Sequence, residues 1–508
     1  MATATSSINT INRVKIHEVT KITPMMIPDD DDDLICLPLT LFDTYWLKFL
    51  PVERLFFYEV ADLTWDLFDS EILPKLKHSL SLTLGIHYLP LAGHMVWPEH
   101  AAKPAIYYFL PGQDQKEDIV NGVTVAVAES EGLDFDVLSG DGIRQAVEFR
   151  ALTPQLSISD NKAEVVSIQI TLFPKQGFCI GISNHHAFFD GRSTMMFIKS
   201  WAYLCKQYLD IASSQQQQQQ QQTTICLPSE LIPSFDRAFI NENDPKGFDL
   251  VYVNNWLSFT GNDRSLKVLP SFNDVNKLVR ATYVLTRAHL KKLRDKLLLL
   301  EDRNRQTSPN KLHLSTFVLA CAYVFTCMVK ARGGGESDRD VILAFTADYR
   351  SRLDPPVPTN YFGNCVGSHT RLVKARDFVE EPAATGLGGV AFVAHKLSEM
   401  VQEIGGGLTI QGFDEEKLVK LMAVMQRVSQ GGQGLGVAGS IHFDVYGSDF
   451  GWGRPKKVEI VSIDTTGAVS LAESRHGDGG VEVGLALGKQ DMDNFASFFD
   501  QGLKDLIV

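Results

Sequence analysis

Two adjacent histidines and a nearby aspartate are the residues of this chain best suited to acid–base chemistry. His185 and His186 end an alternating apolar stretch, and Asp190 and Gly191 follow them. An imidazole has an ordinary pKa of about 6.5, so near neutral pH it can take the proton of a hydroxyl that attacks a carbonyl. Asp190 could orient the imidazole, as in a triad, or face away and hold the loop through an arginine. The HxxxD pattern by itself favours the plainer interpretation, a strand end with a satisfied histidine.

Other catalytic signatures are missing from the sequence. It contains no G-x-S-x-G elbow for a serine hydrolase and no H-E-x-x-H pattern for a zinc hydrolase. The seven cysteines are scattered, odd in number and never spaced as C-x-x-C. We therefore expect free thiols in a reducing cytosol, and neither a disulfide framework nor a zinc site.

Length and composition predict a globular protein of two domains. The chain has 508 residues, and this length is more than one hydrophobic core usually supports. Its hydrophobic fraction of 44% is typical of a globular protein. We expect an N-terminal domain over residues 1–212, a linker and crossover over residues 213–245, and a C-terminal domain over residues 246–508. The linker prediction rests on the tract Gln215–Gln222, which cannot build a core. The run Asp29–Asp33 is expected to be a solvated loop, because its charges repel one another.

Charge and hydropathy narrow the choice of partners. The net charge of −13 argues against general nucleic-acid binding, although not against a local basic pocket for a phosphorylated cofactor. No apolar run reaches the roughly 18 residues of a membrane span, and the N-terminus lacks a charged segment followed by an apolar core. We expect a cytosolic monomer that acts on small molecules and binds neither membranes nor nucleic acid.

The elements that must position the histidines can be read from the periodicity. Alternating apolar residues over 166–172 and 178–182 predict a hairpin whose first strand is half-buried. Apolar residues four apart predict helices over 76–84 and 197–208, and the apolar run 315–329 predicts a buried helix. Residues 481–487 predict a further strand. Mixed sheets with packed helices, arranged in two lobes, follow from this alternation.

A second motif changes the interpretation of the histidines. The segment Asp449–Gly453 reads DFGWG, and with HxxxD at His186–Asp190 before it the chain resembles the plant BAHD acyltransferases, which use acyl-CoA donors. The similarity covers nearly the whole chain. Its other landmarks are LKHSLSLTLGIHYLPLAGHM at 76–95, PSFDR at 233–237, LSTFVLACAYVFTC at 314–327 and GGVEVGLAL at 479–487.

Finer matches resemble one branch of that family. They are NYFGNC at 360–365, LPLTLFDTYWL at 37–47 and VAESEGLDFDVLSGD at 127–141. That branch acylates anthocyanin, flavonoid and other phenolic glucosides, most often with malonyl-CoA. The chain departs from the family pattern in the glutamine tract, the aspartate run and glycine-rich insertions near 380–436. These departures lie in expected linkers or loops, so they put only local flexibility in doubt.

The resemblance implies an α/β fold and a mechanism. The fold would be two similar domains like chloramphenicol acetyltransferase, each a mixed sheet with flanking helices, with a channel between them. His186 would take the proton from an acceptor hydroxyl, expected to be the 6-hydroxyl of a glucose, whose oxygen would attack the thioester directly. Asp190 would form a structural salt bridge with Arg350, which we prefer over Arg352. Malonyl-CoA would be a co-substrate, with no tightly bound cofactor and no metal.

Further residues receive roles from the same resemblance. The motif residues Asp449, Phe450, Gly451, Trp452 and Gly453 would shape the channel wall near the coenzyme or, more plainly, form a packed turn. After them, Arg454 and Lys456 would meet coenzyme phosphates or be solvated. The remaining assignments are Asn364 and Ser440 as donors to the oxyanion, His185 and Arg192 as contacts of the malonyl carboxylate, and Thr40 and Asp43 as contacts of the acceptor.

Two other functions stay open. An aromatic acyltransferase that uses hydroxycinnamoyl-CoA on the same glycosides would need an apolar slot for its donor, and the sequence does not reveal one. A catalytically silent binding protein with the same fold would not need His186, Asp190 and DFGWG to be intact, so these residues count against it.

Overall fold

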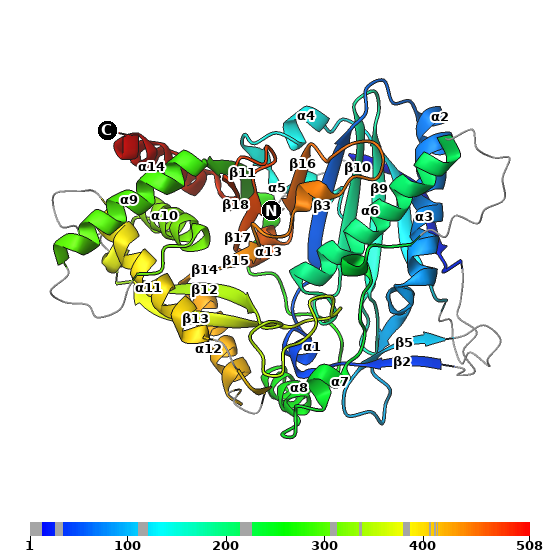
Figure 1. The fold of residues 1–508 in the computed structure, drawn as a ribbon, viewed down its shortest axis with the longest axis horizontal. Coiled ribbons are helices and arrows are strands. Elements are labelled where there is room, and N and C mark those ends of the chain that lie inside the picture. Colours follow the sequence, from blue (N-terminus) through cyan, green and yellow to red (C-terminus); the bar gives the residue numbers. More distant parts are fainter. Residues whose placement is uncertain are drawn as a thin grey trace, which may run out of the picture.

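Most of the chain forms two lobes of mixed sheet and helix, which lie side by side along the longest axis (Figure 1). The computed structural model describes residues 13–25, 34–109, 120–213, 226–304, 312–334, 338–378, 387–405, 408–410, 413 and 415–507. Asp29–Asp33 and Gln215–Gln222 lie outside these ranges, so the expectations for them stay predictions.

The first lobe is built on a six-stranded sheet. Its strands, in spatial order, are β1 (Val14–Ile22), β6 (Val123–Ser130), β9 (Val166–Phe173), β10 (Gly177–Asn184), β3 (Val52–Glu59) and β16 (Lys457–Ile460). The predicted hairpin is β9–β10, which pairs antiparallel along its whole length. The expectation that β9 is half-buried is wrong, because all of its residues are buried. Its second face is covered by α5 (Ala146–Arg150) and the turn that follows, where Gln169 donates a hydrogen bond to the carbonyl of Ala151.

Two long helices cover the first face of this sheet. They are α3 (Leu73–Ile86) and α6 (Gly191–Ser213), which lie beside β9 and β10 in Figure 1. Leu76, Leu80 and Leu84 are buried, as the four-residue spacing predicts. The indole of Trp201 in α6 donates a hydrogen bond to the Leu76 carbonyl at 3.2 Å. Packing against α3 therefore fixes the direction in which α6 leaves the histidine turn.

The second lobe contains two smaller sheets. The five-stranded one has the order β15 (Val437–Gly439), β17 (Val469–Glu473), β18 (Val481–Gly488), β11 (Leu278–Leu285) and β7 (Arg144–Gln145). The three-stranded one has the order β13 (Val366–Lys374), β12 (Asp340–Asp348) and β14 (Gln433–Leu435). Parallel and antiparallel pairs occur together, since β12 pairs antiparallel with β13 and parallel with β14. The predicted mixed sheets are thus present.

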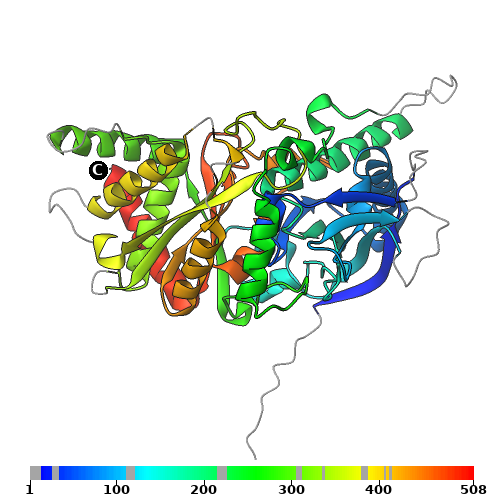
Figure 2. The same cartoon turned by 90° about the horizontal axis from the view of Figure 1, so that it is seen from below.

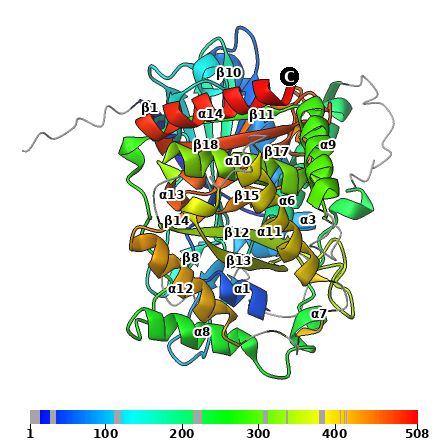
Figure 3. The same ribbon diagram turned by 90° about the vertical axis from the view of Figure 1, so that its left-hand side faces the viewer.

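Helices cover the outer side of the second lobe, which faces the viewer in Figure 3. They are α9 (Arg287–Asn304), α10 (Thr316–Ala331), α11 (Gly388–Ile404), α12 (Lys417–Ser429) and α14 (Lys489–Ile507). The predicted buried helix is α10, whose N-cap Ser315 accepts a hydrogen bond from the backbone N–H of Val318. Its residues are buried nearly all round, which explains why its sequence shows no polar face.

Short elements complete the fold. A small sheet has the order β2 (Leu34–Pro38), β5 (Ala105–Phe109), β4 (His94–Val96) and β8 (Lys162–Glu164). Short helical segments are α1 (Leu41–Tyr45), α2 (Trp65–Leu67), α4 (Phe135–Leu138), α7 (Ala238–Asn241) and α13 (Ile463–Thr466). Helix α8 (Phe248–Phe259) lies between the two lobes in Figure 2, and it packs against α1.

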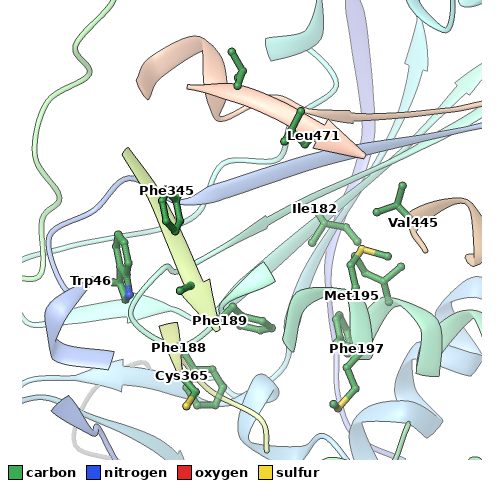
Figure 4. Packing of buried hydrophobic residues seen from close by; sticks show 14 of the residues in the cluster. Trp46, Ile182, Phe188, Phe189, Met195, Phe197, Phe345, Cys365, Val445 and Leu471 are labelled. Carbon is green, nitrogen blue, oxygen red and sulfur yellow. The ribbon is translucent and has the colours of Figure 1, made fainter. Parts of the chain in front are cut away.

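The two lobes exchange strands. Strand β16 comes late in the sequence but pairs with β3 at the edge of the first sheet, and β7 comes early but pairs with β11 in the second lobe. One continuous core joins them, and Figure 4 shows side chains that both lobes contribute to it, among them Ile182 and Met195 of the first lobe and Leu471 and Phe345 of the second. The division at residues 212 and 246 remains a prediction, but it would not separate the two sheets.

Within the described ranges, no helix combines the length and apolar character that a membrane crossing requires. All seven cysteines are free thiols, as their scattered spacing predicts.

Candidate active site

A cavity of about 710 Å³ lies where the two lobes meet. The first lobe contributes the segment Trp46–Arg54 without its buried Leu47 and Glu53, together with the start of α6. The second lobe contributes residues of β12, β13, α12 and β15. Its wall combines large apolar side chains with a few polar ones, which is the usual character of a small-molecule site. His186 is one of these polar residues.

His186 lies in the turn between β10 and α6, and its ring is fixed by two aromatic side chains. The indole of Trp46 stacks on it with 4.5 Å between ring centroids and 8° between planes. Phe49 meets it edge-on at 5.8 Å. Its Nδ1 is enclosed and has no hydrogen-bond partner in the described part of the chain. This leaves Nε2 as the nitrogen that can serve a substrate in the cavity.

Burial keeps the imidazole of His186 neutral. It lowers the pKa of His186 to about 4, although the charge of Asp190 acts in the opposite direction. At neutral pH the ring therefore carries no proton on one nitrogen and can accept one from a hydroxyl. The expected general base is thus deprotonated, positioned and on the wall of the cavity.

Asp190 faces away from the imidazole and forms the expected salt bridge with Arg350. The distance from Arg350 Nη1 to Asp190 Oδ2 is 2.7 Å, and both side chains are at most 2% exposed. Asp190 Oδ1 also accepts the N–H of Ser193 at 2.8 Å, so it caps α6. Burial raises the pKa of Asp190, but Arg350 outweighs it and holds the pKa below its ordinary value. Asp190 is therefore a positioning residue and not a triad member.

The other arginine that the sequence offered does not reach Asp190. Arg352 instead donates to the carbonyl of Asp348 at 2.6 Å. Arg350 additionally donates to the carbonyls of Tyr361 and Gly363, which belong to the YFGNC segment. The same arginine therefore ties the histidine turn of the first lobe to a loop of the second.

A buried polar network holds the backbone of His186, and it corrects three predictions. The amide of Asn364 donates to the His186 carbonyl at 2.9 Å and to Asp43 Oδ1 at 3.1 Å. Thr40 donates to Asp43 Oδ2 through its N–H and its hydroxyl, each at 2.9 Å. All three side chains are fully buried and none lines the cavity. Asn364 is thus no oxyanion donor, because its amide nitrogen is engaged inside the protein, and Thr40 and Asp43 are no acceptor contacts, because they bind each other away from the cavity.

His185 is also misassigned as a contact of an acyl carboxylate. It is 1% exposed and is absent from the cavity wall. Burial, with the nearby charges of His186 and Lys48, lowers its pKa to about 3, so it is neutral. Its Nδ1 accepts the N–H of Ala187 at 3.2 Å. His185 shapes the turn and offers no cation.

Besides His186 and Asp190, two predicted residues lie on the cavity wall, namely Arg192 and Ser440. Arg192 is well exposed, donates to the Thr359 carbonyl at 3.0 Å and lies 3.9 Å from an oxygen of Asp348. The hydroxyl oxygen of Ser440 accepts the N–H of His442 at 3.2 Å. Its O–H can still point into the cavity, so its role as an oxyanion donor stays a prediction.

The DFGWG motif is a packed turn and does not form the channel wall. None of its residues lines the cavity. Phe450 packs edge-on against Trp201 with ring centroids 4.7 Å apart, and Trp452 packs against Phe178 at 5.8 Å. Asp449 accepts the N–H groups of Gly451 and Gly453 and pairs with Lys206. The plainer of the two interpretations is the one that the geometry supports.

The basic residues after the motif also lie away from the cavity. Lys456 is held by Glu59 at 2.6 Å and Asp136 at 2.8 Å. Arg454 is exposed. Neither residue lines the cavity, and contact with coenzyme phosphates outside it stays a prediction.

Several wall residues escaped the sequence interpretation. Trp46, Phe49 and Arg54 form one side of the cavity, and Trp46 fixes the ring of His186. A signal for Arg54 did exist, because it stands directly before the apolar stretch LFFY in β3. For the two aromatic residues no local pattern distinguishes a cavity wall from a core.

Comparison with known proteins gives consistent results. A family model described as the Transferase family matches residues 16–501. The malonyl-CoA:anthocyanidin 5-O-glucoside-6''-O-malonyltransferase of Arabidopsis thaliana is 43% identical over 98% of this chain and 100% of its own length. Phenolic glucoside malonyltransferase 2 of the same plant is 44% identical over 92% of this chain and 94% of its own length.

Among solved structures, vinorine synthase superposes with a TM-score of 0.63 at 17% identity, covering 95% of this chain and 96% of its own. This likeness confirms the predicted α/β fold.

Proposed function

This chain belongs to the Transferase family, the plant BAHD acyltransferases, and on that premise we propose that it transfers a malonyl group from malonyl-CoA to a sugar hydroxyl. The acceptor class is a phenolic, flavonoid or anthocyanin glucoside, acylated at the 6-hydroxyl of its glucose. The two malonyltransferases with 43% and 44% identity support this choice of donor and acceptor. We further propose that the enzyme is a cytosolic monomer that needs no tightly bound cofactor.

The geometry of His186 supports the chemistry. Its neutral imidazole accepts the proton of the acceptor hydroxyl, and the oxygen then attacks the thioester carbonyl. A C–O bond forms, the C–S bond breaks, and the imidazolium returns the proton to the coenzyme A thiolate. This direct attack requires no acyl-enzyme, so the free cysteines need no part in it. The single observation that carries the proposal is the stacked, neutral ring of His186 on the cavity wall.

The negative oxygen of the tetrahedral intermediate needs a donor nearby. Ser440 lines the cavity from the second lobe, whereas the histidine turn lines it from the first lobe. We assign its hydroxyl to this role, since Asn364 is engaged with the His186 carbonyl. The aromatic wall of Trp46 and Phe49 gives the planar aglycone of such an acceptor a surface on which to pack.

The test is transfer itself. Purified protein is incubated with malonyl-CoA, coumaroyl-CoA or acetyl-CoA and with a set of phenolic glucosides, and free thiol and acylated product are measured. We expect malonyl-CoA to be the best donor. Replacement of His186 by Ala should lower kcat by about 10²- to 10⁴-fold, as expected for loss of a general base.

His442 provides the matched control, because it is a second, exposed histidine on the same cavity wall. His442→Ala should keep its activity. Loss of turnover in His442→Ala with full turnover in His186→Ala would move the base to His442. No thiol release with any acyl-CoA would favour a silent binding protein, and preference for coumaroyl-CoA would favour the aromatic acyltransferase.

A further inference from the structure

Arg54 is a buried cation without an ion-pair partner among the described residues, although its guanidinium lies over the ring of Phe443 at 5.8 Å. Its side chain is 2% exposed, and its Nε and Nη1 have no hydrogen-bond acceptor among the residues that the structure describes. The other deeply buried arginines of the lobe junction are paired, with carboxylate distances of 2.8 Å for Arg144, 2.7 Å for Arg280 and 2.7 Å for Arg350. Arg54 is the exception, because no carboxylate of the described residues lies within 4.0 Å of its guanidinium, and its charge is balanced only by the more distant Glu473 and by the ring of Phe443. An anion that enters the cavity can therefore complete an ion pair with Arg54.

The position of Arg54 indicates where that partner binds. Arg54 lies on β3, where it pairs with Ile182 of β10 on one side and Ile460 of β16 on the other. It lines the same cavity as His186. Because Nε and Nη1 are enclosed by protein, Nη2 is the nitrogen that the cavity can reach.

Gly191 leaves space beside this guanidinium. A Cβ at residue 191 would lie 3.6 Å from Arg54 Nη2 and would collide with the Phe443 ring at 2.6 Å. Gly191 directly follows Asp190 and opens α6, whose N-terminal end carries a partial positive charge. Because Asp190 already caps this helix end, the guanidinium of Arg54 is the group at this corner that offers a positive charge to an anion next to the turn that holds His186.

Other cations on the cavity wall are already engaged. Lys48 donates to the carbonyls of Ser265 and Lys267. Lys199 pairs with Asp444 at 2.8 Å, and Arg192 donates to the Thr359 carbonyl. Burial lowers the pKa of Arg54 to about 10, opposed by the charge of Glu473, so Arg54 stays protonated at neutral pH.

We propose that Arg54 binds the free carboxylate of the acyl donor and so selects malonyl-CoA over uncharged acyl donors. This inference rests on the proposed function. A carboxylate oxygen can accept a charge-assisted hydrogen bond from Nη2 of Arg54, and malonyl differs from acetyl only by its carboxylate. The carboxylate of malonyl lies one methylene from the carbonyl that is attacked, so an anion site must be close to the base, as Arg54 is to the histidine turn.

The experiment compares two donors in one variant. Arg54→Met and the wild type are assayed with malonyl-CoA and with acetyl-CoA on the same glucoside. We expect kcat/KM for malonyl-CoA to fall about 10- to 100-fold, the loss of a charge-assisted hydrogen bond, while kcat/KM for acetyl-CoA changes less than about threefold. The kcat/KM of Arg54→Lys for malonyl-CoA should lie between those of the wild type and Arg54→Met, because lysine keeps the charge but not the geometry of the guanidinium.

Lys199→Met is the matched control, since it removes a paired cation from the same wall and should leave the donor preference unchanged. Equal losses with both donors in Arg54→Met would overturn the inference in favour of a structural role. A loss of malonyl preference in Arg192→Met but not in Arg54→Met would also overturn it. If Arg54→Met does not fold, Arg54→Lys decides, and unchanged donor preference there counts against the inference.

Binding separates this inference from the proposed function. Calorimetry with His186→Ala protein should show tighter binding of malonyl-CoA than of acetyl-CoA, and adding Arg54→Met should remove the difference. If the wild type transfers no malonyl group, the proposed function is wrong. The difference in binding between malonyl-CoA and acetyl-CoA would still test the role of Arg54. Equal binding of the two donors to the His186→Ala protein would refute the role of Arg54.

Discussion

The imidazole of His186 stacks on the indole of Trp46, and burial governs its protonation. Burial lowers the pKa of His186 to about 4, so the base is free over the whole neutral range. Activity requires the unprotonated ring and is therefore lost only as the pH falls through the lowered value. We expect kcat/KM to be nearly constant from pH 7.5 to pH 5.5, whereas an ordinary histidine would halve it near pH 6.5.

Trp46→Ala tests the cause of that shift. Without the indole, water reaches the ring and the inflection of kcat/KM should move up toward pH 6.5. The measurement is a pH–rate profile for both proteins within the range where each remains folded. An inflection near pH 6.5 in the wild type, or the same profile in both proteins, would show that burial by Trp46 does not set the pKa.

The sequence could name the base at the residue scale but not its surroundings. His186, Asp190 and Arg350 are found from their motifs, and the salt bridge to Arg350 is confirmed. The roles expected for Asn364, Thr40 and Asp43 are wrong, because their side chains turn inward and bind one another. Whether a polar side chain in a turn faces a cavity or a neighbour depends on long-range packing, which local spacing does not encode.

At the scale of elements, the DFGWG turn stabilises the first lobe by packing against α6 and β10. It lies at the end of α6 that is far from His186, where Gly451 has a φ of 108°. A Cβ at Gly451 would lie 2.3 Å from Cδ1 of Leu209 in α6. We expect Gly451→Ala to lower the free energy of unfolding by about 1–3 kcal/mol, through backbone strain and crowding, while KM for the acyl-CoA donor stays the same. Thermal melting and donor kinetics measure the two effects.

Gly453→Ala is the matched variant for this turn. Gly453 has a φ of 93°, but a Cβ there meets no atom within 4 Å. It should therefore show the strain alone and lose less stability than Gly451→Ala. A raised KM with an unchanged melting temperature in Gly451→Ala would instead place the motif at the coenzyme.

Elements were the most predictable level of this protein. The hairpin β9–β10, the helices α3 and α6 and the buried helix α10 follow from apolar periodicity, because each buries a face or its whole surface. The periodicity gave no warning that Ser167, Gln169 and Thr171 are buried too. A polar face can be covered when its hydrogen bonds are met, as Gln169 shows with the Ala151 carbonyl.

At the scale of the molecule, the strand exchange is closed by a buried network of charges. Glu459 of β16 binds Arg144 of β7 at 2.8 Å and Arg280 of β11 at 2.7 Å, and Arg280 also pairs with Asp464. These four residues are at most 3% exposed and come from distant parts of the sequence. Nothing local predicts their meeting, which is why a division of the chain at residues 212 and 246 misses the crossing of β7 and β16.

The folded molecule should be sensitive to mild acid. Burial lowers the pKa of His94 to about 3, with help from Lys21 and Lys162, and likewise lowers those of His185 and His186. In the unfolded chain these rings take up protons near pH 6.5, so unfolding binds protons and stability falls as the pH drops below that value. Asp464 acts in the opposite direction, because burial raises its pKa to about 6 despite Arg280.

Four histidines, because burial also lowers the pKa of His369 to about 4, outweigh Asp464 and leave a net loss of stability between pH 6.5 and pH 5. Each histidine contributes at most about 1.4 kcal/mol per pH unit there. We expect the urea midpoint to fall over this range. His94 lies on β4, away from the cavity wall, so His94→Gln should flatten the pH dependence without altering the site. The exposed His100 supplies the control, and His100→Gln should leave the dependence unchanged. A urea midpoint that stays level or rises from pH 7.5 to pH 5 would mean that these histidine rings take up protons in the folded state. The mechanism, which requires a neutral His186, would then be contradicted.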